Sequence, residues 1–116
     1  MAGKAESVVN LPDENSVSKA LTYLAETDEP YAVAAAAVKA QEHVLKMAKA
    51  LEYLEAEGPV AQRDAIALAS DEYRGAVNNY ENVVATKEIM ANKRKRAELT
   101  IEVWRSLNAA HRRGNV

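Results

Sequence analysis

The stretch from Ala69 to Trp104, ASDEYRGAVNNYENVVATKEIMANKRKRAELTIEVW, decides the fold of this chain. Within it, steps that alternate between four and three residues mark one face of a helix. The positions on that face are Ala69, Tyr73, Ala76, Tyr80, Val83, Lys87, Met90, Arg94, Ala97, Ile101 and Trp104. Such a heptad repeat is typical of a helix that packs lengthwise against another helix. The stretch therefore predicts a long helix with a seam that faces a partner helix.

The residues around this stretch predict where the helix begins and ends. Gly58 is a good helix stop and Pro59 prevents continuation, so a new helix is expected over residues 60–112. Gly75, Asn78 and Asn79 are poor helix formers, and a break at this point is the main alternative.

Two more helices are predicted upstream. Residues 30–57 include the alanine-rich run YAVAAAAVKA, which allows two helix axes to approach closely. Residues 14–26 form a shorter amphipathic helix that Asp13 can cap. The segment TDEP, Thr27–Pro30, reads as a break between these two helices, because an acidic pair followed by proline suits a helix start. Residues 1–13 are expected to form a loose arm.

The expected architecture is therefore all-α, with a short N-terminal helix and a long antiparallel helical hairpin in one domain over residues 14–116. In this hairpin, residues 30–57 end opposite about Lys87, and the remainder of residues 60–112 extends beyond them. Apolar side chains on that remainder require cover, which the short helix and a second copy of the chain supply. We expect a homo-oligomer whose interface includes Tyr73, Tyr80, Met90, Ile101, Trp104 and Leu107.

The composition excludes several classes of protein. The 116 residues contain no cysteine, which rules out a disulfide framework, a thiolate zinc site and a cysteine nucleophile. No segment approaches the roughly 18 apolar residues of a membrane span, and no apolar run suits a signal peptide. We expect a cytoplasmic protein without a membrane partner.

Catalytic motifs are absent from the sequence: there is no GxSxG, no HExxH and no P-loop. His43 and His111 lie far apart, and neither has the Glu-x-x-His pattern of a di-metal helical bundle. The acidic cluster of Glu52, Glu55 and Glu57 is most simply a solvated surface. We expect no enzymatic activity, no cofactor and no metal site.

The charges of the chain are distributed unevenly. Residues 1–59 carry five basic and ten acidic side chains, whereas residues 60–116 carry ten basic and seven acidic ones, which changes the net charge from −5 to +3. The positive end could bind the phosphates of a nucleic acid. The residues that would do so are Lys93, Arg94, Lys95, Arg96, Arg105, Arg112 and Arg113. The alternative is a solvated helix end, because Glu98 can pair with Arg94 and Glu102 with Arg105.

The segments KRKRAELTIEVWRS and RRGN, together with YLAETDEPYAVAAAAVKAQE and EYLEAEGPVAQRDAIALAS upstream, resemble a group of small helical proteins of tailed bacteriophages and prophages. The resemblance covers about residue 22 to the C-terminus. It implies an accessory role in DNA recombination or replication in the cytoplasm of a bacterial host, with DNA or a phage or host protein as partner. It implies no catalytic residues.

Two hypotheses follow from the sequence. In the first, the chain is a nucleic-acid-associated accessory protein that binds through its basic end, and tyrosines near basic residues could stack on bases. In the second, it is a structural or adaptor protein that binds another protein or itself through the face around Trp104. Tyr73 and Tyr80 are more typical of a half-buried seam than of a stacking platform.

Overall fold

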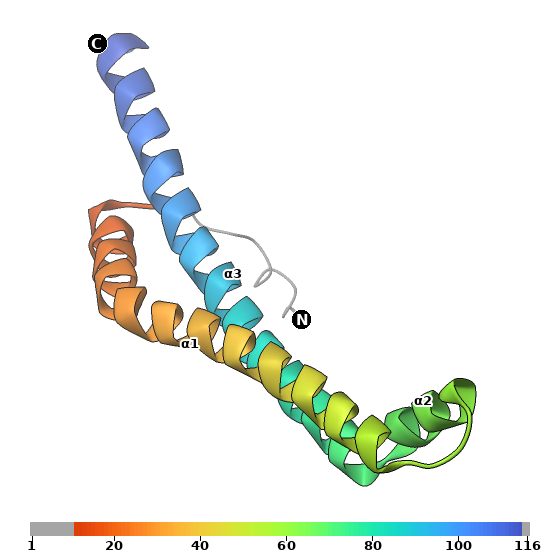
Figure 1. The fold of residues 1–116 in the computed structure, drawn as a ribbon. Coiled ribbons are helices and arrows are strands. Elements are labelled where there is room, and N and C mark those ends of the chain that lie inside the picture. The colour runs from red at the N-terminus through yellow and green to blue at the C-terminus, as the bar shows by residue number, and fades with distance from the viewer. Residues whose placement is uncertain (1–10, 115–116) are drawn as a thin grey trace, which may run out of the picture. The chain divides into compact units, whose positions relative to one another are not determined.

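The structure, a computed structural model, describes residues 11–114, and these residues form three helices. The helices are α1 (Glu14–Glu55), α2 (Val60–Ala69) and α3 (Asp71–Gly114), as Figure 1 shows. No strand occurs between residues 11 and 114, so the predicted all-α class is confirmed. Most of the predicted arm, residues 1–10, lies outside the described residues. Within the described part, no helix is both long and apolar enough to cross a bilayer.

Contacts group the chain into two compact units, and each unit contains a segment of both long helices. Among the described residues, unit 1 holds 11–28 and 92–114, and unit 2 holds 29–91. Within each unit the segments of α1 and α3 run antiparallel (Figure 1). In unit 1, Asp28 pairs with Arg94, and in unit 2 the hydroxyl of Tyr80 lies 3.5 Å from the carboxylate of Glu42. The antiparallel pairing predicted for the hairpin is therefore present within each unit.

The N-terminal end of α1 agrees with the predicted cap. The backbone N–H of Ser16 donates to Asp13 Oδ1 at 2.8 Å, and the Ser16 hydroxyl donates to the same oxygen at 2.9 Å. Both bonds stabilise the carboxylate, so they hold the pKa of Asp13 below its usual range. Asp13 satisfies a backbone donor that the first turn of α1 would otherwise leave open.

The predicted break at Thr27–Pro30 is wrong, because α1 continues through Pro30 as one helix. Separate helices over 14–26 and 30–57 were expected from the capping residues alone. The less exposed positions Leu24, Thr27, Tyr31 and Ala34 keep steps of three and four across the supposed break. Lengthwise packing of this face outweighs the cost of about 3 kcal/mol for proline inside a helix.

The single helix predicted for residues 60–112 is also wrong, since it is broken at Ser70 and not at Gly75–Asn79. The backbone N–H and the hydroxyl of Ser70 both donate to the Ala67 carbonyl, at 3.2 and 2.8 Å. The Ser70 hydroxyl also accepts a bond from the backbone N–H of Tyr73 at 3.1 Å. One side chain thus ends α2 and caps α3, whose first turn begins with Asp71 and Glu72.

Helix α2 packs inside unit 2. Ala67 is fully buried, and the Arg63 guanidinium lies 4.6 Å from the centre of the Tyr53 ring, a cation–π contact that joins α2 to α1. The turn between the two helices contains the predicted stop, Gly58, whose φ of +110° favours glycine.

The predicted seam of α3 is confirmed over Tyr73–Trp104, where every seam position is buried or half-buried, whereas Ala69 is exposed. The most buried residues of the described chain are small: Ala20, Ala67, Ala76 and Ala97. Alanine at these contacts lets the helices approach closely, so the interior consists of narrow helix–helix seams. Among residues 11–114, no large side chain is fully buried.

Candidate nucleic-acid interface

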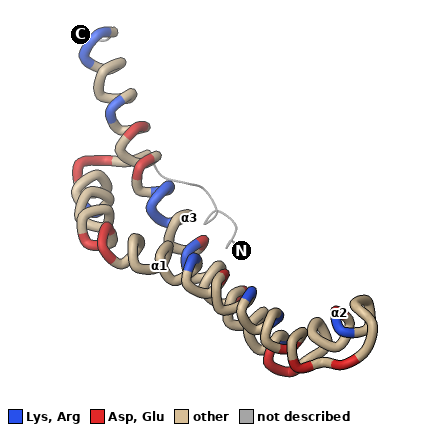
Figure 2. The backbone as a smooth tube through the Cα atoms, viewed as in Figure 1, with Lys and Arg blue, Asp and Glu red and all other residues tan. Residues whose placement is uncertain are grey.

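The seven basic residues predicted to bind nucleic acid all lie on the part of α3 that belongs to unit 1. Figure 2 colours the Lys and Arg positions along the backbone blue, including those toward the C-terminal end of α3. Four of them are consecutive and point in different directions around the helix, since successive residues turn by about 100°. Lys93, Lys95 and Arg96 are exposed, whereas Arg94 is half-buried. Lys93–Arg96 therefore do not form a single binding surface.

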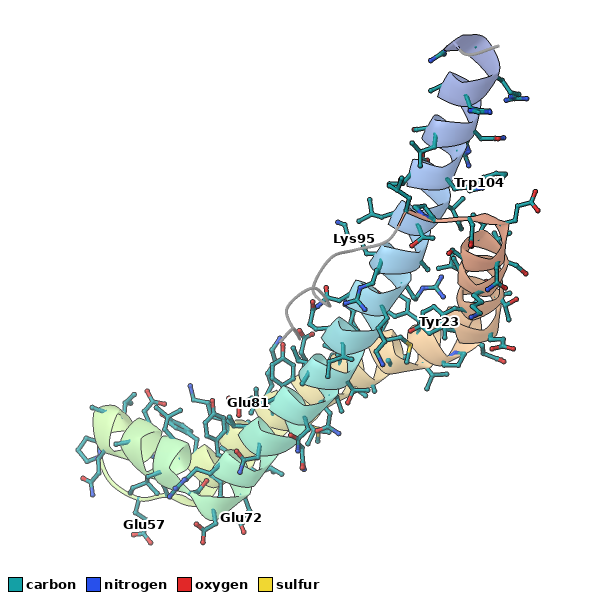
Figure 3. The ribbon with its side chains drawn as sticks, turned by 180° about the vertical axis from the view of Figure 1, so that it is seen from behind. Tyr23, Glu57, Glu72, Glu81, Lys95 and Trp104 are labelled. Carbon is teal, nitrogen blue, oxygen red and sulfur yellow. The ribbon has the colours of Figure 1, made fainter. Side chains whose placement is uncertain are left out.

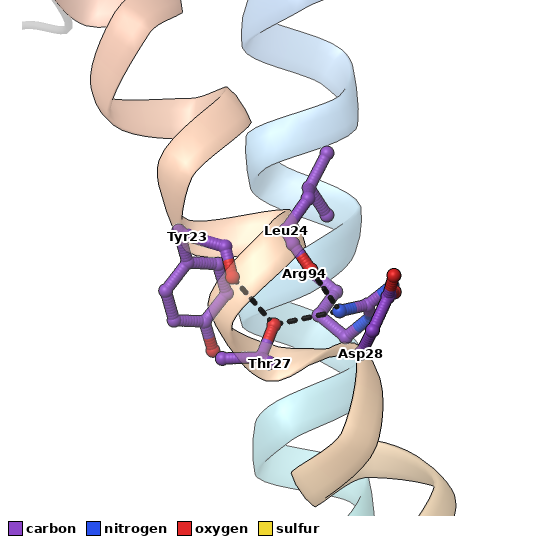
Figure 4. A network of polar contacts seen from close by, with 5 residues as sticks. All are labelled: Tyr23, Leu24, Thr27, Asp28 and Arg94. Carbon is purple, nitrogen blue, oxygen red and sulfur yellow. Dashed lines mark hydrogen bonds and ion pairs between the residues drawn. The ribbon is translucent and has the colours of Figure 1, made fainter.

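Arg94 belongs to a polar network within unit 1 (Figure 4). Its Nη1 donates to the carbonyl of Leu24 at 3.0 Å and to Thr27 Oγ1 at 2.6 Å. Its Nη2 donates to Asp28 Oδ1 at 2.8 Å. The Thr27 hydroxyl in turn donates to the carbonyl of Tyr23 at 2.7 Å. These contacts assign Arg94 to the junction of α1 and α3, so we remove it from the phosphate-binding set.

A shallow groove lies between the first turns of α1 and the 93–100 segment of α3, both within unit 1. It has a volume of about 440 Å³. We call it the basic groove, and it is lined by Ser16, Lys19, Ala20, Tyr23, Lys93, Arg96, Ala97 and Thr100. Among the residues that the structure describes, none that lines this groove is acidic. Three cations, two hydroxyls and one aromatic ring thus border the same depression.

Lys19 and Tyr23 are members of the basic groove that the sequence analysis missed. They lie four residues apart, which places them on one side of α1. Figure 3 labels Tyr23 on α1. No local motif marks either residue. Ala20 and Ala97 are buried and line the groove, and the antiparallel register that brings their segments together also places Lys19 and Tyr23 at the groove.

Lys95 and Arg105 border a different groove of unit 1, where two carboxylates accompany them. Its lining residues are Leu21, Lys95, Glu98, Leu99, Ile101, Glu102 and Arg105. The predicted pairing of Glu102 with Arg105 is confirmed, with Nη1 at 3.4 Å from Oε2. Because Glu98 and Glu102 offset the two cations, this groove should bind phosphate more weakly than the basic groove. Arg112 and Arg113 lie exposed in the last turn of α3, where cations favour the helix dipole.

The residues predicted to form an oligomer interface lie mostly on seams within the chain. Tyr73, Tyr80 and Met90 are half-buried in unit 2, and Tyr80 contacts Glu42 of α1. In unit 1, Ile101 and Trp104 are half-buried, and only Leu107 of the predicted set is exposed. Figure 3 labels Trp104 on α3. Leu107 is the member of the predicted set that is most open to another copy, and the predicted interface stays a prediction.

The remaining titratable candidates show little that suggests chemistry. His43 is exposed on α1. Partial burial raises the pKa of Glu52 above its usual range, and the nearby charges of Glu72 and Glu55 raise it further. In the described part of the chain, no three histidine, cysteine or acidic residues gather closely enough to hold a metal ion.

Comparison of the chain with models of protein families, with curated proteins and with solved structures found no match.

Proposed function

We propose that the protein is a non-enzymatic accessory protein that binds the phosphate backbone of nucleic acids through the basic groove of unit 1. The observation that carries this proposal is the convergence of Lys19, Lys93 and Arg96 from two helices on one groove whose described lining contains no carboxylate. A positive field of this kind attracts phosphates without a sequence code.

The neighbours of the three cations suit a nucleic acid. The Ser16 hydroxyl donates to Asp13 Oδ1 and the Thr100 hydroxyl donates to the Arg96 carbonyl, so each can still accept from an N–H or O–H group of a nucleic acid. The ring of Tyr23 offers a face on which an unpaired base can stack, which favours single strands over duplexes. Lys93 and Arg96 were predicted from the sequence, and Lys19 takes the place of Arg94 as the third cation. Lys95, Arg105, Arg112 and Arg113 extend the positive field around them.

The phage-like resemblance agrees with this role but contributes no residue to it. We propose on that basis an accessory function in phage DNA recombination or replication, exercised in the cytoplasm of a bacterial host. Oligomerisation would give each assembly several basic grooves, so that weak individual contacts add to a useful overall affinity.

The test is fluorescence anisotropy with labelled single- and double-stranded oligonucleotides over a range of salt concentrations. We expect binding that weakens steeply with salt, with a slope of log K against log salt of about −2 to −3 for three neutralised phosphates. The double substitution Lys93→Glu and Arg96→Glu should reduce affinity at least about tenfold.

The matched control is the double substitution Lys46→Glu and Arg74→Glu, which changes the net charge equally but affects exposed residues of unit 2. It should reduce affinity much less. Equal losses in the two variants would show that overall charge governs binding and that the basic groove is not a site. No binding at low salt by the unmodified protein would exclude a nucleic-acid role.

An adaptor role is the second candidate, and an exposed apolar row on α3 favours it. Leu99, Val103 and Leu107 recur at intervals of four residues and are all exposed. A partner helix could bind this row beside the half-buried Trp104. Retrieval of a specific protein partner that Val103→Glu abolishes, together with no nucleic-acid binding, would favour this role.

A further inference from the structure

A second apolar row occupies the part of α1 that belongs to unit 2, on the side turned away from the seam. Its members are Val33, Ala36, Ala40, Val44, Met47, Leu51 and Leu54, and all of them are exposed. Their spacings of three and four residues confine them to a sector of about 80° on the helix. We call this row the outer stripe. Its five larger side chains are between 45 and 69% exposed.

The outer stripe has the composition of a helix–helix interface. No charged residue lies within its sector between Val33 and Leu54. Ala37 and Ala48 border it on one side, and His43, Ala32 and Ala50 border it on the other. Small flanking residues let a second helix approach closely. A continuous exposed apolar row of this length on a helix marks a surface that another element covers.

The distribution of side-chain size along the outer stripe identifies what covers it. Ala36 and Ala40 occupy its first half, and Met47, Leu51 and Leu54 occupy its second half. When two copies lie antiparallel about a twofold axis between residues 43 and 44, Leu51 faces Ala36 of the other copy. In the same register Met47 faces Ala40, and Leu54 faces Val33. Leu51 and Met47 thus each meet an alanine and Leu54 meets the smaller valine, which fills the interface evenly.

We propose that the outer stripe is the dimer interface of the protein, and that two copies of α1 pack on it antiparallel, with Val44 at the twofold axis. A parallel pair would place Leu51 on Leu51 and Ala36 on Ala36, which leaves one end crowded and the other unfilled. The antiparallel pair is self-complementary, as a closed twofold interface requires. The dimer needs no property of the basic groove, so either proposal can fail alone.

Sedimentation equilibrium of the unmodified chain and of two variants tests the location of the interface. The unmodified protein should be a dimer at roughly 100 μM. Leu51→Glu places a carboxylate in the interface of both copies and should weaken dimerisation at least about hundredfold. Ile89→Glu is the matched control, because Ile89 is exposed in the same unit on α3, outside the stripe. It should leave the dimer intact.

Single cysteines test the orientation, because the natural chain contains none. Val44→Cys should form a disulfide-linked dimer on mild oxidation, since the two thiols meet near the axis. Leu54→Cys should not, because 21 residues separate position 54 from its symmetry mate along the helix, about 30 Å. Helical content by circular dichroism verifies that each variant is folded.

Three results would overturn the proposal. A monomeric unmodified chain would show that the outer stripe is not a self-association surface. Dimerisation that survives Leu51→Glu would place the interface elsewhere. Ready cross-linking of Leu54→Cys, with none for Val44→Cys, would show that the copies do not pair in the antiparallel register.

Discussion

The guanidinium of Arg94 lies 2.8 Å from the carboxylate of Asp28, although 66 residues separate them in the sequence. The Arg94 side chain is 17% exposed and that of Asp28 is 74% exposed. An ion pair with so exposed a partner contributes little by itself. The bonds from Arg94 to the Leu24 carbonyl and the Thr27 hydroxyl are more sheltered, and they fix α1 against α3 in unit 1.

Removal of the Arg94 side chain should therefore destabilise the protein. We expect Arg94→Ala to lower the free energy of unfolding by about 2 kcal/mol, since two half-buried acceptors lose a charged donor. Asp28→Asn should cost less than about 1 kcal/mol. Urea unfolding followed by circular dichroism measures both. Arg96→Ala, at an exposed position two residues further on, is the control and should change stability by about 0.5 kcal/mol or less. Equal effects at 94 and 96 would contradict the structural role of Arg94.

Ser70 should contribute to the stability of unit 2, because its side chain ends α2 and caps α3. Ser70→Ala removes the hydroxyl that accepts from Tyr73 N–H and donates to the Ala67 carbonyl. The expected loss is about 1–2 kcal/mol of unfolding free energy, measured by urea unfolding. Ser18→Ala, on the exposed side of α1, should be close to neutral. A neutral Ser70→Ala would mean that α2 and α3 can join without the cap.

Alanine should change the stability of the protein in opposite directions at Gly58 and at Gly75. At Gly58, φ is +110° and an added Cβ would lie 2.8 Å from Gln62 Oε1, so Gly58→Ala should cost about 1–3 kcal/mol. At Gly75, within α3, an added Cβ meets no atom within 4 Å, so Gly75→Ala should stabilise by about 0.5–1 kcal/mol. Thermal unfolding of both variants gives the signs directly. A stabilising Gly58→Ala would contradict the turn geometry.

Glu52 should make the stability of the protein depend on pH. Its pKa in the folded chain is raised above the usual value of 4.5, so folding disfavours the ionised form. This unfavourable contribution is complete at pH values above the folded pKa and disappears as the pH falls below 4.5. Glu52→Gln should therefore raise the melting temperature at pH 7 and have little effect at pH 4. Glu81→Gln, at an exposed position on α3, serves as the control in the same measurement. An equal shift at both pH values would rule out ionisation as the cause.

The α3 seam was predictable from sequence because it depends on the local spacing of the heptad repeat. The helix stop at Gly58 was predictable because it depends on one residue with special conformational freedom. The predicted break at Thr27–Pro30 is wrong because capping residues and proline are local signals, whereas the packing face through Leu24, Thr27 and Tyr31 favours one continuous helix. Ser70 followed by Asp71 and Glu72 is a helix N-cap pattern. The predicted break was placed instead at the poor helix formers near Gly75.

The candidate site was less predictable, for a different physical reason. The exposed cations at 93 and 96 follow from their place in a charged run, but Lys19 and Tyr23 reach the basic groove only through the antiparallel register of α1 and α3. The same register directs Arg94 away from solvent. Long-range pairing of this kind leaves no mark in the spacing of either segment alone.

The division of the chain into units also bears on the order in which it folds during synthesis. Unit 2 is one continuous segment, residues 29–91, whereas unit 1 joins residues from both ends of the chain. A ribosome releases the first turns of α1 before unit 2, and residues 92–114 after it. Unit 2 can close while the second half of unit 1 is still being made. Residues 29–91 lie between Asp28 and Arg94 in the sequence. Once they have folded as unit 2, the loop of unfolded chain that the Arg94–Asp28 contact must close is shorter.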